Sequence, residues 1–539
     1  MYKDITYQIR VVKNNECCLL RDHIRSNTGL KQGCPLSPTL ANLFLYDIHK
    51  NLLIGDISLG DQNFNSISWA DDLVIFSTSH AATQGLLSKL DKYCQNNDII
   101  INLKKTKALI FCKGRRPDTP QFTSKGIPID FCTSFKYLGI EFQQNGSFKV
   151  ACKTRLEKAQ NAIYLLDRTI NNGGLVSTAL NSKLFFSKIA PILLYGAPIW
   201  GPAPTLTLSY NPITPITVKN LEAFKTRIST RASRPIKIKV LGQERKTLKV
   251  YTTSVYDKIN ILKYDTDDQN FRRHCEIYEL HKPFQTFLCK HAKNILGISK
   301  YASSTLACAE LGWYPIQHKI ITSTIKYWLR LQEGTSNKLL DNAFTFNIQS
   351  ETDWINGIKS LEHDLNLGND LSVLNLVNRI LQAKYSNLTK VKIETEQHLK
   401  GYSNLNKDGH YGPQNYLTKI VNSLHRTTLT KLRTNSYSTD NYVTRNLERD
   451  HCPKCSLNEK DDLEHWLLRC NNRQLTQPRN NLLRLLKKAT ITNNQQLPFF
   501  DLLNCNFPNA NNSTISELYK NLHRLYTANE RVTANSNSV

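Results

Sequence analysis

Two segments near the start of the chain, at 29–44 and 68–77, limit its fold more than any other feature. The second reads SWADDLVIFS and places Asp71 and Asp72 side by side. Residues that favour β-strands flank the pair on both sides, so we expect a tight hairpin with both carboxylates near its tip. Adjacent carboxylates on a rigid turn are suited to binding Mg²⁺ for phosphoryl transfer.

The first segment, GLKQGCPLSPTLANLF, predicts a glycine-rich turn that leads into a helix. Ser37 is a good N-cap residue, and Pro38 suits the first helical position. Apolar residues then recur at every fourth position, which is the spacing of one helix face. These residues are Leu40, Phe44, Ile48 and Leu52.

The charge of the chain indicates its class of partner. Lys and Arg outnumber Asp and Glu by 26 in 539 residues, which favours a polyanion such as a nucleic acid or an anionic membrane. The most apolar stretch, 184–200, is interrupted by a lysine, two prolines and a glycine, so it is unsuited to spanning a membrane. We therefore expect a nucleic-acid partner and no membrane. The 14 cysteines are scattered, which indicates free thiols and an intracellular location.

The two segments resemble the second and third conserved blocks of a reverse transcriptase palm, as found in non-LTR (LINE-type) retrotransposons. This resemblance implies an RNA-directed DNA polymerase that adds dNTPs to a primer 3′-hydroxyl by two-metal nucleotidyl transfer. Asp71 and Asp72 match the metal-binding pair, which implies Mg²⁺ or Mn²⁺. The family's first catalytic aspartate lies well upstream of the second block, whereas only 28 residues precede Gly29 and Asp4 is too close to it. We therefore expect an N-terminally truncated open reading frame and a very poor polymerase.

Residues of the second and third blocks also match positions that contact the substrates in the family. The resemblance implies that Gln32, Gly33 and Ser37 lie beside the nascent base pair and the template strand. Trp69 stands two positions before the aspartate pair, where the family usually has Tyr, Phe or Met. Its ring would keep the apolar packing beside the primer terminus.

The fourth and fifth blocks follow. Lys105 matches a lysine that neutralises the triphosphate and protonates the departing pyrophosphate. Lys104 and Lys107 are equally available, and a solvated basic turn is the alternative interpretation. Tyr137 and Gly139 match the primer grip, which implies that their backbone positions the primer.

The chain as a whole predicts an α+β fold: a partial right-hand polymerase palm, a helical thumb, and a mostly α-helical C-terminal region with a small zinc-binding cluster. Short β patterns alternate with helices at first, including a helix over 82–96, and helical periodicity dominates from residue 148. The expected domains are the palm at 1–147, the thumb and a basic linker at 148–260, a helical region at 261–440, the zinc-cluster region at 441–503 and a disordered tail at 504–539.

One stretch within the expected linker is strongly basic. Residues 225–249 contain nine Lys or Arg residues and a single acid, Glu244. The stretch is either a solvated linker or an arm that contacts nucleic acid.

Four residues near the C-terminus have the pattern C-x2-C-x9-H-x4-C, which suits tetrahedral Zn²⁺. They are Cys452, Cys455, His465 and Cys470. The sequence at 461–468 is acidic and then apolar, which predicts a short helix that presents His465. The pattern resembles the Cys-His cluster of LINE-type proteins, which is thought to hold the template RNA. Four unconnected residues are the alternative, and His451 is a further candidate ligand.

The leading hypothesis is a reverse transcriptase that acts in the nucleus on an RNA template, a DNA primer or target and dNTPs. A non-catalytic RNA- or DNA-binding remnant of the same element is the alternative, supported by the basic stretch and the zinc cluster. A third interpretation is an unexpressed pseudogene product. The sequence does not predict an oligomeric state.

Overall fold

The computed structural model forms two compact units. The first consists of Met1–Phe148 and Gly334–Ser350, and the second of Lys149–Glu333 and Glu351–Val539. The residues that the structure describes are 5–13, 16–26, 29, 33–112, 114–173, 177–201, 236–239, 247–250, 269–365, 374–395, 402, 405, 412–436, 451–452, 454–460, 462–490, 499–508 and 510–536. Gln32 and most of the basic stretch 225–249 lie outside these residues.

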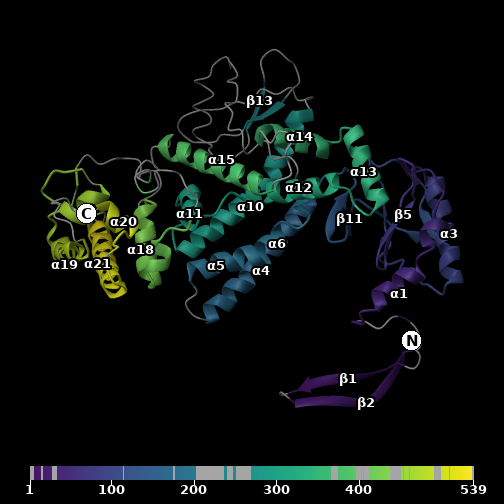
Figure 1. Ribbon diagram of the computed structural model, residues 1–539, viewed down its shortest axis with the longest axis horizontal. Coiled ribbons are helices and arrows are strands. Elements are labelled where there is room, and N and C mark those ends of the chain that lie inside the picture. Colours follow the sequence, from purple (N-terminus) through teal and green to yellow (C-terminus); the bar gives the residue numbers. More distant parts are fainter. Residues whose placement is uncertain are drawn as a thin grey trace. The chain divides into compact units, whose positions relative to one another are not determined.

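The strands of the first unit form small two-stranded sheets, in which β7 and β10 pair in parallel and the other pairs are antiparallel. In Figure 1 the unit is drawn in purple and blue, except for the green helix α13. Its elements are β1 (Ile5–Lys13), β2 (Glu16–Ser26), α1 (Ser37–Phe44), α2 (Ile48–Asn51), β3 (Ser58–Leu59), β4 (Gln62–Asn63), β5 (Ser66–Trp69), β6 (Asp72–Ile75), α3 (His80–Asn96), β7 (Ala108–Leu109), β8 (Phe122–Ser124), β9 (Ile127–Ile129), β10 (Phe131–Cys132), β11 (Ser134–Tyr137), β12 (Ile140–Gln143) and α13 (Lys338–Gln349).

Helix α3 supplies the core of the first unit. The side chain of Ser79 caps its N-terminus by accepting the backbone N–H of Ala82. The apolar face predicted for 82–96 is confirmed, because it is buried against β6 on one side and against β8 and β9 on the other. Ile75 of β6 packs against both core clusters. The strand that begins at Asp72 is therefore anchored on α3.

The start of α1 differs by one residue from the prediction. Leu36 is the N-cap residue and no side chain caps the helix, so Ser37 lies inside α1 rather than at its cap. The reason is a preceding turn, in which the N–H of Ser37 donates to the carbonyl of Cys34 (3.1 Å). This turn brings Ser37 into the helix one residue early.

The predicted four-residue apolar repeat is divided between two helices. α1 ends at Phe44, and a turn separates it from α2. Ile48 and Leu52 are buried in the core with α3, whereas Phe44 is 55 % exposed. The prediction that Phe44 lies on one helix face with Ile48 and Leu52 is therefore wrong, because the turn separates them into two helices.

A distant segment completes the first unit. α13 packs against β3, where Asn342 donates hydrogen bonds to the carbonyl of Leu59 (3.0 Å) and to the carboxylate of Asp61 (2.9 Å). A Cβ at Gly60, which has a positive φ of 60°, would lie 3.2 Å from Asn342. The contact thus joins residues 283 positions apart in the chain.

The second unit is mostly helical. None of the helices in the described part of the chain has both the length and the hydrophobicity that crossing a membrane requires. The elements are α4 (Lys149–Gly173), α5 (Thr178–Leu184), the π-helical segment η1 (Phe185–Ile189), α6 (Ala190–Leu193), α7 (Ala197–Trp200), β13 (Ile236–Lys239), β14 (Thr247–Val250), α10 (Gln269–Leu296), α11 (Ser304–Leu311), α12 (Ile316–Gln332), α14 (Asp353–Leu365), α15 (Leu374–Thr395), α17 (Tyr416–Lys419), α18 (Ser423–Arg433), the π-helical segment η4 (His465–Arg469), α19 (Arg473–Ala489), α20 (Phe499–Asn504) and α21 (Asn512–Ser536).

Aromatic rings pack at the centre of the second unit. Phe185 stacks on Trp313, with ring centroids 4.9 Å apart, and on His291 at 5.0 Å. Trp200 meets Phe284 edge to face at 5.5 Å. These contacts join η1 and α7 to α10 and to the residues that follow α11, and each ring buries a large apolar area.

A buried ion pair links α11 to α18. Nε of Arg433 donates to both carboxylate oxygens of Glu310, at 3.0 and 3.1 Å, and both side chains are fully buried. Tyr402 also donates its hydroxyl hydrogen to Glu310. The other guanidinium nitrogens donate to the carbonyl of Leu503 (2.9 Å) and to the side-chain oxygens of Asn504 (2.5 Å) and Gln414 (2.9 Å). The pair therefore joins α11 and α18 to Tyr402, to Gln414 and to the end of α20.

The end of the chain is helical, so the expectation of a disordered tail over 504–539 is wrong. α21 packs along α19 and against α18. Its buried side chains include Leu518, Leu522 and Leu525, which follow each other at intervals of three or four residues. The Asn and Ser residues that suggested disorder include Asn512 and Ser513, which are exposed at the start of the helix.

Candidate active site and metal centre

The two adjacent aspartates lie at the tip of a hairpin, as predicted. β5 and β6 are antiparallel with Trp69 opposite Asp72, which leaves Ala70 and Asp71 as the turn. Ala70 has a positive φ of 54°, which a tight two-residue hairpin turn requires. Both carboxylates are exposed, and the Trp69 side chain beside them is 68 % exposed. The tip therefore presents carboxylate oxygens, which can act as metal ligands, and an aromatic ring to solvent.

The first strand of this hairpin is held by a histidine that the sequence did not single out. The ring of His49 on α2 forms hydrogen bonds with the hydroxyls of Ser66 (Nδ1 to Oγ, 2.8 Å) and Ser68 (Nε2 to Oγ, 3.0 Å). Burial lowers the pKa of His49. The amide of Asn65, which is almost fully buried, also donates to the carbonyl of Phe76 (3.0 Å) at the base of the hairpin. No local motif indicated these contacts, because they join separate elements.

A second hairpin brings Tyr137 near the aspartates. β11 and β12 are joined by a turn at Leu138 and Gly139, both of which have positive φ (45° and 82°). Burial, and then the charge of the Asp72 carboxylate, raises the pKa of Tyr137. The structure therefore places Tyr137 within electrostatic reach of Asp72.

The lysines of the fourth block are distinguished by their partners. Lys107 forms an ion pair with Asp130 (2.6 Å). It is therefore a poorer candidate than Lys104 or Lys105 for the lysine that neutralises a triphosphate. Lys105 is exposed on a turn in which its N–H donates to the side chain of Asn102 (3.3 Å). Lys104 is exposed as well. Within the described residues, no hydrogen bond or ion pair connects Lys105 with the aspartate pair.

The second block is described in part. Gly33 is exposed and has a φ of 81°, a left-handed conformation that favours glycine. Ser37 is half-buried in the first turn of α1. The prediction for Gln32 lies outside the described residues.

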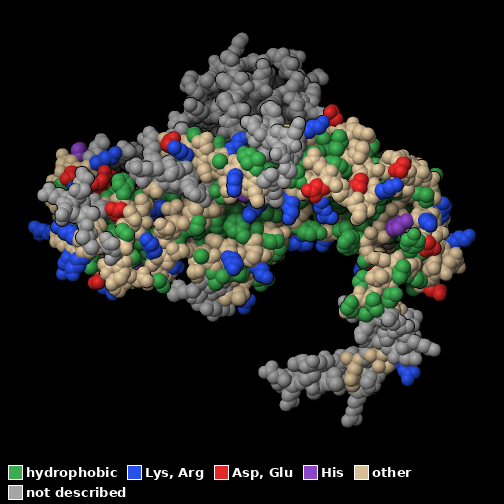
Figure 2. Space-filling model, viewed as in Figure 1, with side chains coloured by type: hydrophobic (Ala, Val, Ile, Leu, Met, Phe, Trp, Pro, Cys, Tyr) green, Lys and Arg blue, Asp and Glu red, His purple; other side chains and the backbone are tan. Residues whose placement is uncertain are grey.

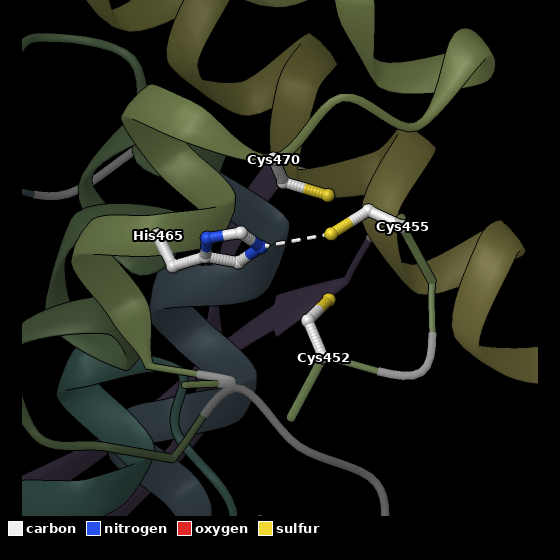
Figure 3. A group of neighbouring side chains, drawn as sticks. All are labelled: Cys452, Cys455, His465 and Cys470. Carbon is white, nitrogen blue, oxygen red and sulfur yellow. Dashed lines mark hydrogen bonds between the residues drawn. The ribbon is translucent and has the colours of Figure 1, made fainter. Parts of the chain in front are cut away.

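The four predicted zinc ligands converge in the second unit (Figure 3). The thiols of Cys452, Cys455 and Cys470 and a ring nitrogen of His465 all lie within 4.8 Å of one another. Cys455 Sγ lies 3.3 Å from Nε2 of His465. His465 begins the π-helical segment η4, which confirms the short helix expected here within the described residues. His451 forms a hydrogen bond with the carbonyl of Asn458 instead and is not part of the cluster.

The donor set and its surroundings fit a zinc ion. Tetrahedral bonds of about 2.3 Å to sulfur and about 2.0 Å to nitrogen place the ligand atoms roughly 3.5–3.8 Å apart. Here the pair of Cys455 Sγ and His465 Nε2 lies 3.3 Å apart, and no pair exceeds 4.8 Å. Nδ1 of His465 forms a hydrogen bond with Glu459 (2.9 Å), which in turn accepts from Arg469 (2.9 Å). Such a carboxylate fixes the tautomer that leaves Nε2 free to bind a metal.

The protonation of Cys455 also suits metal binding. Burial raises the pKa of its thiol, but the backbone N–H of Leu457 and the side chains of His465, Cys452 and Cys470 lower it, and the pKa lies below its ordinary value. A lowered pKa favours the thiolate, which is the form that binds metals.

Comparison with known proteins assigns the first part of the chain. Residues 7–142 match the family model described as reverse transcriptase (RNA-dependent DNA polymerase). Over 179 residues, the chain is 25 % identical to the RNA-directed DNA polymerase from mobile element jockey of Drosophila melanogaster. The chain contains a reverse transcriptase domain of the non-LTR retrotransposon type.

Further relatives of this reverse transcriptase domain come from the same class of element. The chain is 26 % identical over 181 residues to the probable RNA-directed DNA polymerase from transposon BS of Drosophila melanogaster. It is also 26 % identical over 182 residues to the Pol polyprotein from type-1 retrotransposable element R2 of Popillia japonica. The matches cover 32 %, 32 % and 31 % of the chain, and 19 %, 20 % and 28 % of jockey, BS and R2 respectively. The chain therefore spans about a fifth of the length of the first two relatives.

The reverse transcriptase domain contains all the candidate polymerase residues. The aspartate pair, Lys105, Tyr137 and Gly139 all lie within 7–142. The Cys-His cluster lies far outside the matched residues, so the family model says nothing about it.

Proposed function

We propose that the chain catalyses RNA-templated DNA synthesis at the tip of the β5–β6 hairpin. The primer 3′-oxygen forms a bond to the α-phosphorus of a dNTP, the bond to the β-phosphate bridge breaks, and pyrophosphate leaves. The observation that carries this proposal is the exposed pair Asp71 and Asp72 on a tight turn inside the reverse transcriptase domain. Their carboxylates would hold Mg²⁺ or Mn²⁺, which supplies charge stabilisation for the attacking and leaving oxygens.

The neighbouring residues would bind and orient the substrates. Tyr137 and Gly139 would position the primer, because their hairpin brings Tyr137 near Asp72. Lys105 would neutralise the triphosphate and donate a proton to pyrophosphate. The exposed ring of Trp69 would pack beside the primer terminus.

The template side of the site would be formed by the turn before α1. Gln32, Gly33 and Ser37 would contact the template and the nascent base pair. The partners of the chain are then an RNA template, a DNA primer or target and dNTPs, and target-primed synthesis would place the protein in the nucleus.

Primer extension with Mg²⁺ on a poly(A)/oligo(dT) template tests the proposal. Incorporation by the full chain should be abolished by Asp71→Asn and by Asp72→Asn. Asp98→Asn is the matched control, because Asp98 is also exposed with a positive φ of 54° in the same unit, where asparagine is well tolerated. Incorporation that survives in both hairpin variants, or its absence in the unmodified chain, would refute the assignment.

We also propose that the cluster of Cys452, Cys455, His465 and Cys470 holds Zn²⁺. The donor set, the distances and the carboxylate behind His465 support this proposal. Metal bound there would tie the loop before η4 to the residue that follows η4. The expected domains, from the palm at 1–147 through the thumb to the zinc-cluster region at 441–503, remain part of this proposal.

A second candidate function is nucleic-acid binding without catalysis. The exposed face of α19 carries basic residues and amides, and the helix contains no acidic residue. Figure 2 shows Lys and Arg side chains over the surface that α19 forms. The exposed basic residues are Arg473, Arg484, Lys487 and Lys488. They span about 22 Å of helix, which is long enough to contact several phosphates of a nucleic-acid strand.

Salt-dependent RNA binding separates the two candidates. Fluorescence anisotropy of a labelled single-stranded RNA measures the affinity at several salt concentrations. The double variant Lys487→Gln/Lys488→Gln should lower the magnitude of the slope of log affinity against log salt by about 1.4. The control is Lys319→Gln with Lys326→Gln, an equal charge change at exposed positions of α12. RNA binding without incorporation favours the second candidate, and equal effects of the two double variants exclude α19 as the surface.

A further inference from the structure

One arginine of α19 is buried beside the metal centre, whereas Arg473 and Arg484 on the same helix are exposed. Arg479 is 4 % exposed. Its Nη1 donates to the carbonyl of Cys470, and its Nη2 donates to the carbonyl of Trp466 (2.9 Å). Its Nε is buried without a hydrogen-bond partner among the described residues. The guanidinium is therefore held by two backbone carbonyls, one near the start of η4 and one just after its end.

No carboxylate in the described part of the chain forms an ion pair or hydrogen bond with the Arg479 guanidinium. The groups that it contacts are the backbone carbonyls of Trp466 and Cys470, and Cys470 is one of the four proposed zinc ligands. A buried cation with no opposite charge is strongly unfavourable, because burial removes its hydration.

The charges of a loaded centre account for the arginine. Three thiolates contribute −3, a zinc ion +2 and a neutral imidazole nothing, which leaves a net charge of −1. The guanidinium contributes +1, so the buried group as a whole is neutral. Removal of this negative charge would leave the buried guanidinium of Arg479 without an opposite charge among the described residues.

We propose that Arg479 is the counter-cation of the Cys-His metal centre, so that metal binding and burial of the guanidinium depend on each other. This inference rests on the proposed zinc site. Arg479 is a positioning residue in this role: it donates a hydrogen bond to the backbone of one ligand, Cys470, but it does not bind the metal. Because it contacts the carbonyls of Trp466 and Cys470, it also holds both ends of η4 in place.

The test compares Arg479→Lys with Arg479→Met in the full chain. Lys and Met are unbranched side chains of similar length that differ in charge. Zinc affinity is measured by competition with a chromophoric chelator, and the ligand set is checked by the visible spectrum of the Co²⁺-loaded protein. Arg524→Met is the matched control, because Arg524 is exposed on α21, the helix that packs along α19.

We expect Arg479→Met to bind zinc about 10- to 100-fold more weakly, a size typical of changes behind metal ligands. Arg479→Lys should stay within about threefold of the unmodified chain, and Arg524→Met should be unchanged. If Arg479→Met does not fold at any zinc concentration while Arg479→Lys folds and binds, the result also supports the charge role.

Two outcomes overturn the inference. Equal weakening by Lys and Met would show that packing, not charge, matters at this position. Unchanged affinity in Arg479→Met would show that the charge is not needed. If the unmodified chain itself binds no zinc and shows no cobalt–thiolate absorption, the proposed zinc site fails instead, which is a separate result.

Discussion

Replacing Glu310 with glutamine should destabilise the second unit more than any exposed substitution. The change keeps the shape of the side chain but removes the only carboxylate that contacts Arg433 within the described residues. Burial disfavours the charged form of Arg433, yet the charge of Glu310 holds its pKa above its ordinary value. The amide would therefore leave a buried guanidinium without a counter-charge.

The size of this effect follows from the burial of the pair. Both side chains have no exposed area, so solvent cannot screen the loss. Breaking a buried pair by removing one partner costs about 3–5 kcal/mol. Arg433 and Tyr402 both donate hydrogen bonds to the carboxylate of Glu310. Glutamine would replace one of these acceptor oxygens with an NH₂ donor, which adds to the cost.

The assay is urea unfolding followed by tryptophan fluorescence, because Trp313 is buried three positions after Glu310. The double variant Glu310→Gln with Arg433→Met should lose less than the sum of the two single variants, by at least about 2 kcal/mol, since it leaves no stranded charge. A cost below about 1 kcal/mol for Glu310→Gln, or additive single effects, would refute this account of the pair.

Three further predictions concern acid, backbone strain and metal. Burial lowers the pKa of His291 and of His318 from 6.5 to about 4, so the unfolded chain binds more protons below pH 6.5. The free energy of unfolding should then fall by about 3 kcal/mol for each histidine between pH 6.5 and 4, and phenylalanine at both positions should flatten the profile in urea titrations. Gly312→Ala should lower the free energy of unfolding by about 2–4 kcal/mol, because φ is 70° and the new Cβ would lie 2.7 Å from the nitrogen of Pro413. Gly334→Ala is the control: its φ is 82° but the space around it is open, so it should show only the smaller cost of backbone strain in the same assay. Zinc removal by a chelator should speed hydrogen exchange of the segment 451–472 and leave α3 unchanged, and equal exchange before and after chelation would contradict a structural metal.

Features that depend on near neighbours in the chain were accessible from the sequence. The β5–β6 hairpin was predicted because strand-forming residues flank a pair that can form a turn. The buried face of α3 followed from helical spacing, and the Cys-His cluster followed from its ligand pattern. Each of these signals is local, so the residues themselves carry it.

Two predictions for α1 failed because no clear sequence signal marks the turns that flank this helix, and the prediction for the C-terminal tail failed for a different reason. The turn that binds the N–H of Ser37 moved the start of α1, and a second turn after Phe44 broke the apolar face. The tail after residue 504 was expected to be disordered because its composition is polar. Its leucines nevertheless form one stripe, and α19 is present to bury that stripe.

What the sequence determined by itself is therefore the identity of the elements and the chemistry that they carry: an aspartate hairpin in a reverse transcriptase domain and a cluster of three cysteines and a histidine with ligand spacing. Only the tertiary structure decided which distant residues support them. His49 braces the aspartate hairpin, and Arg479 lies beside the cysteines. Arg433 meets Glu310 from 123 positions away. The physical reason is that periodicity and turn chemistry act over a few residues, whereas a buried charge or ring finds its partner only when the helices pack.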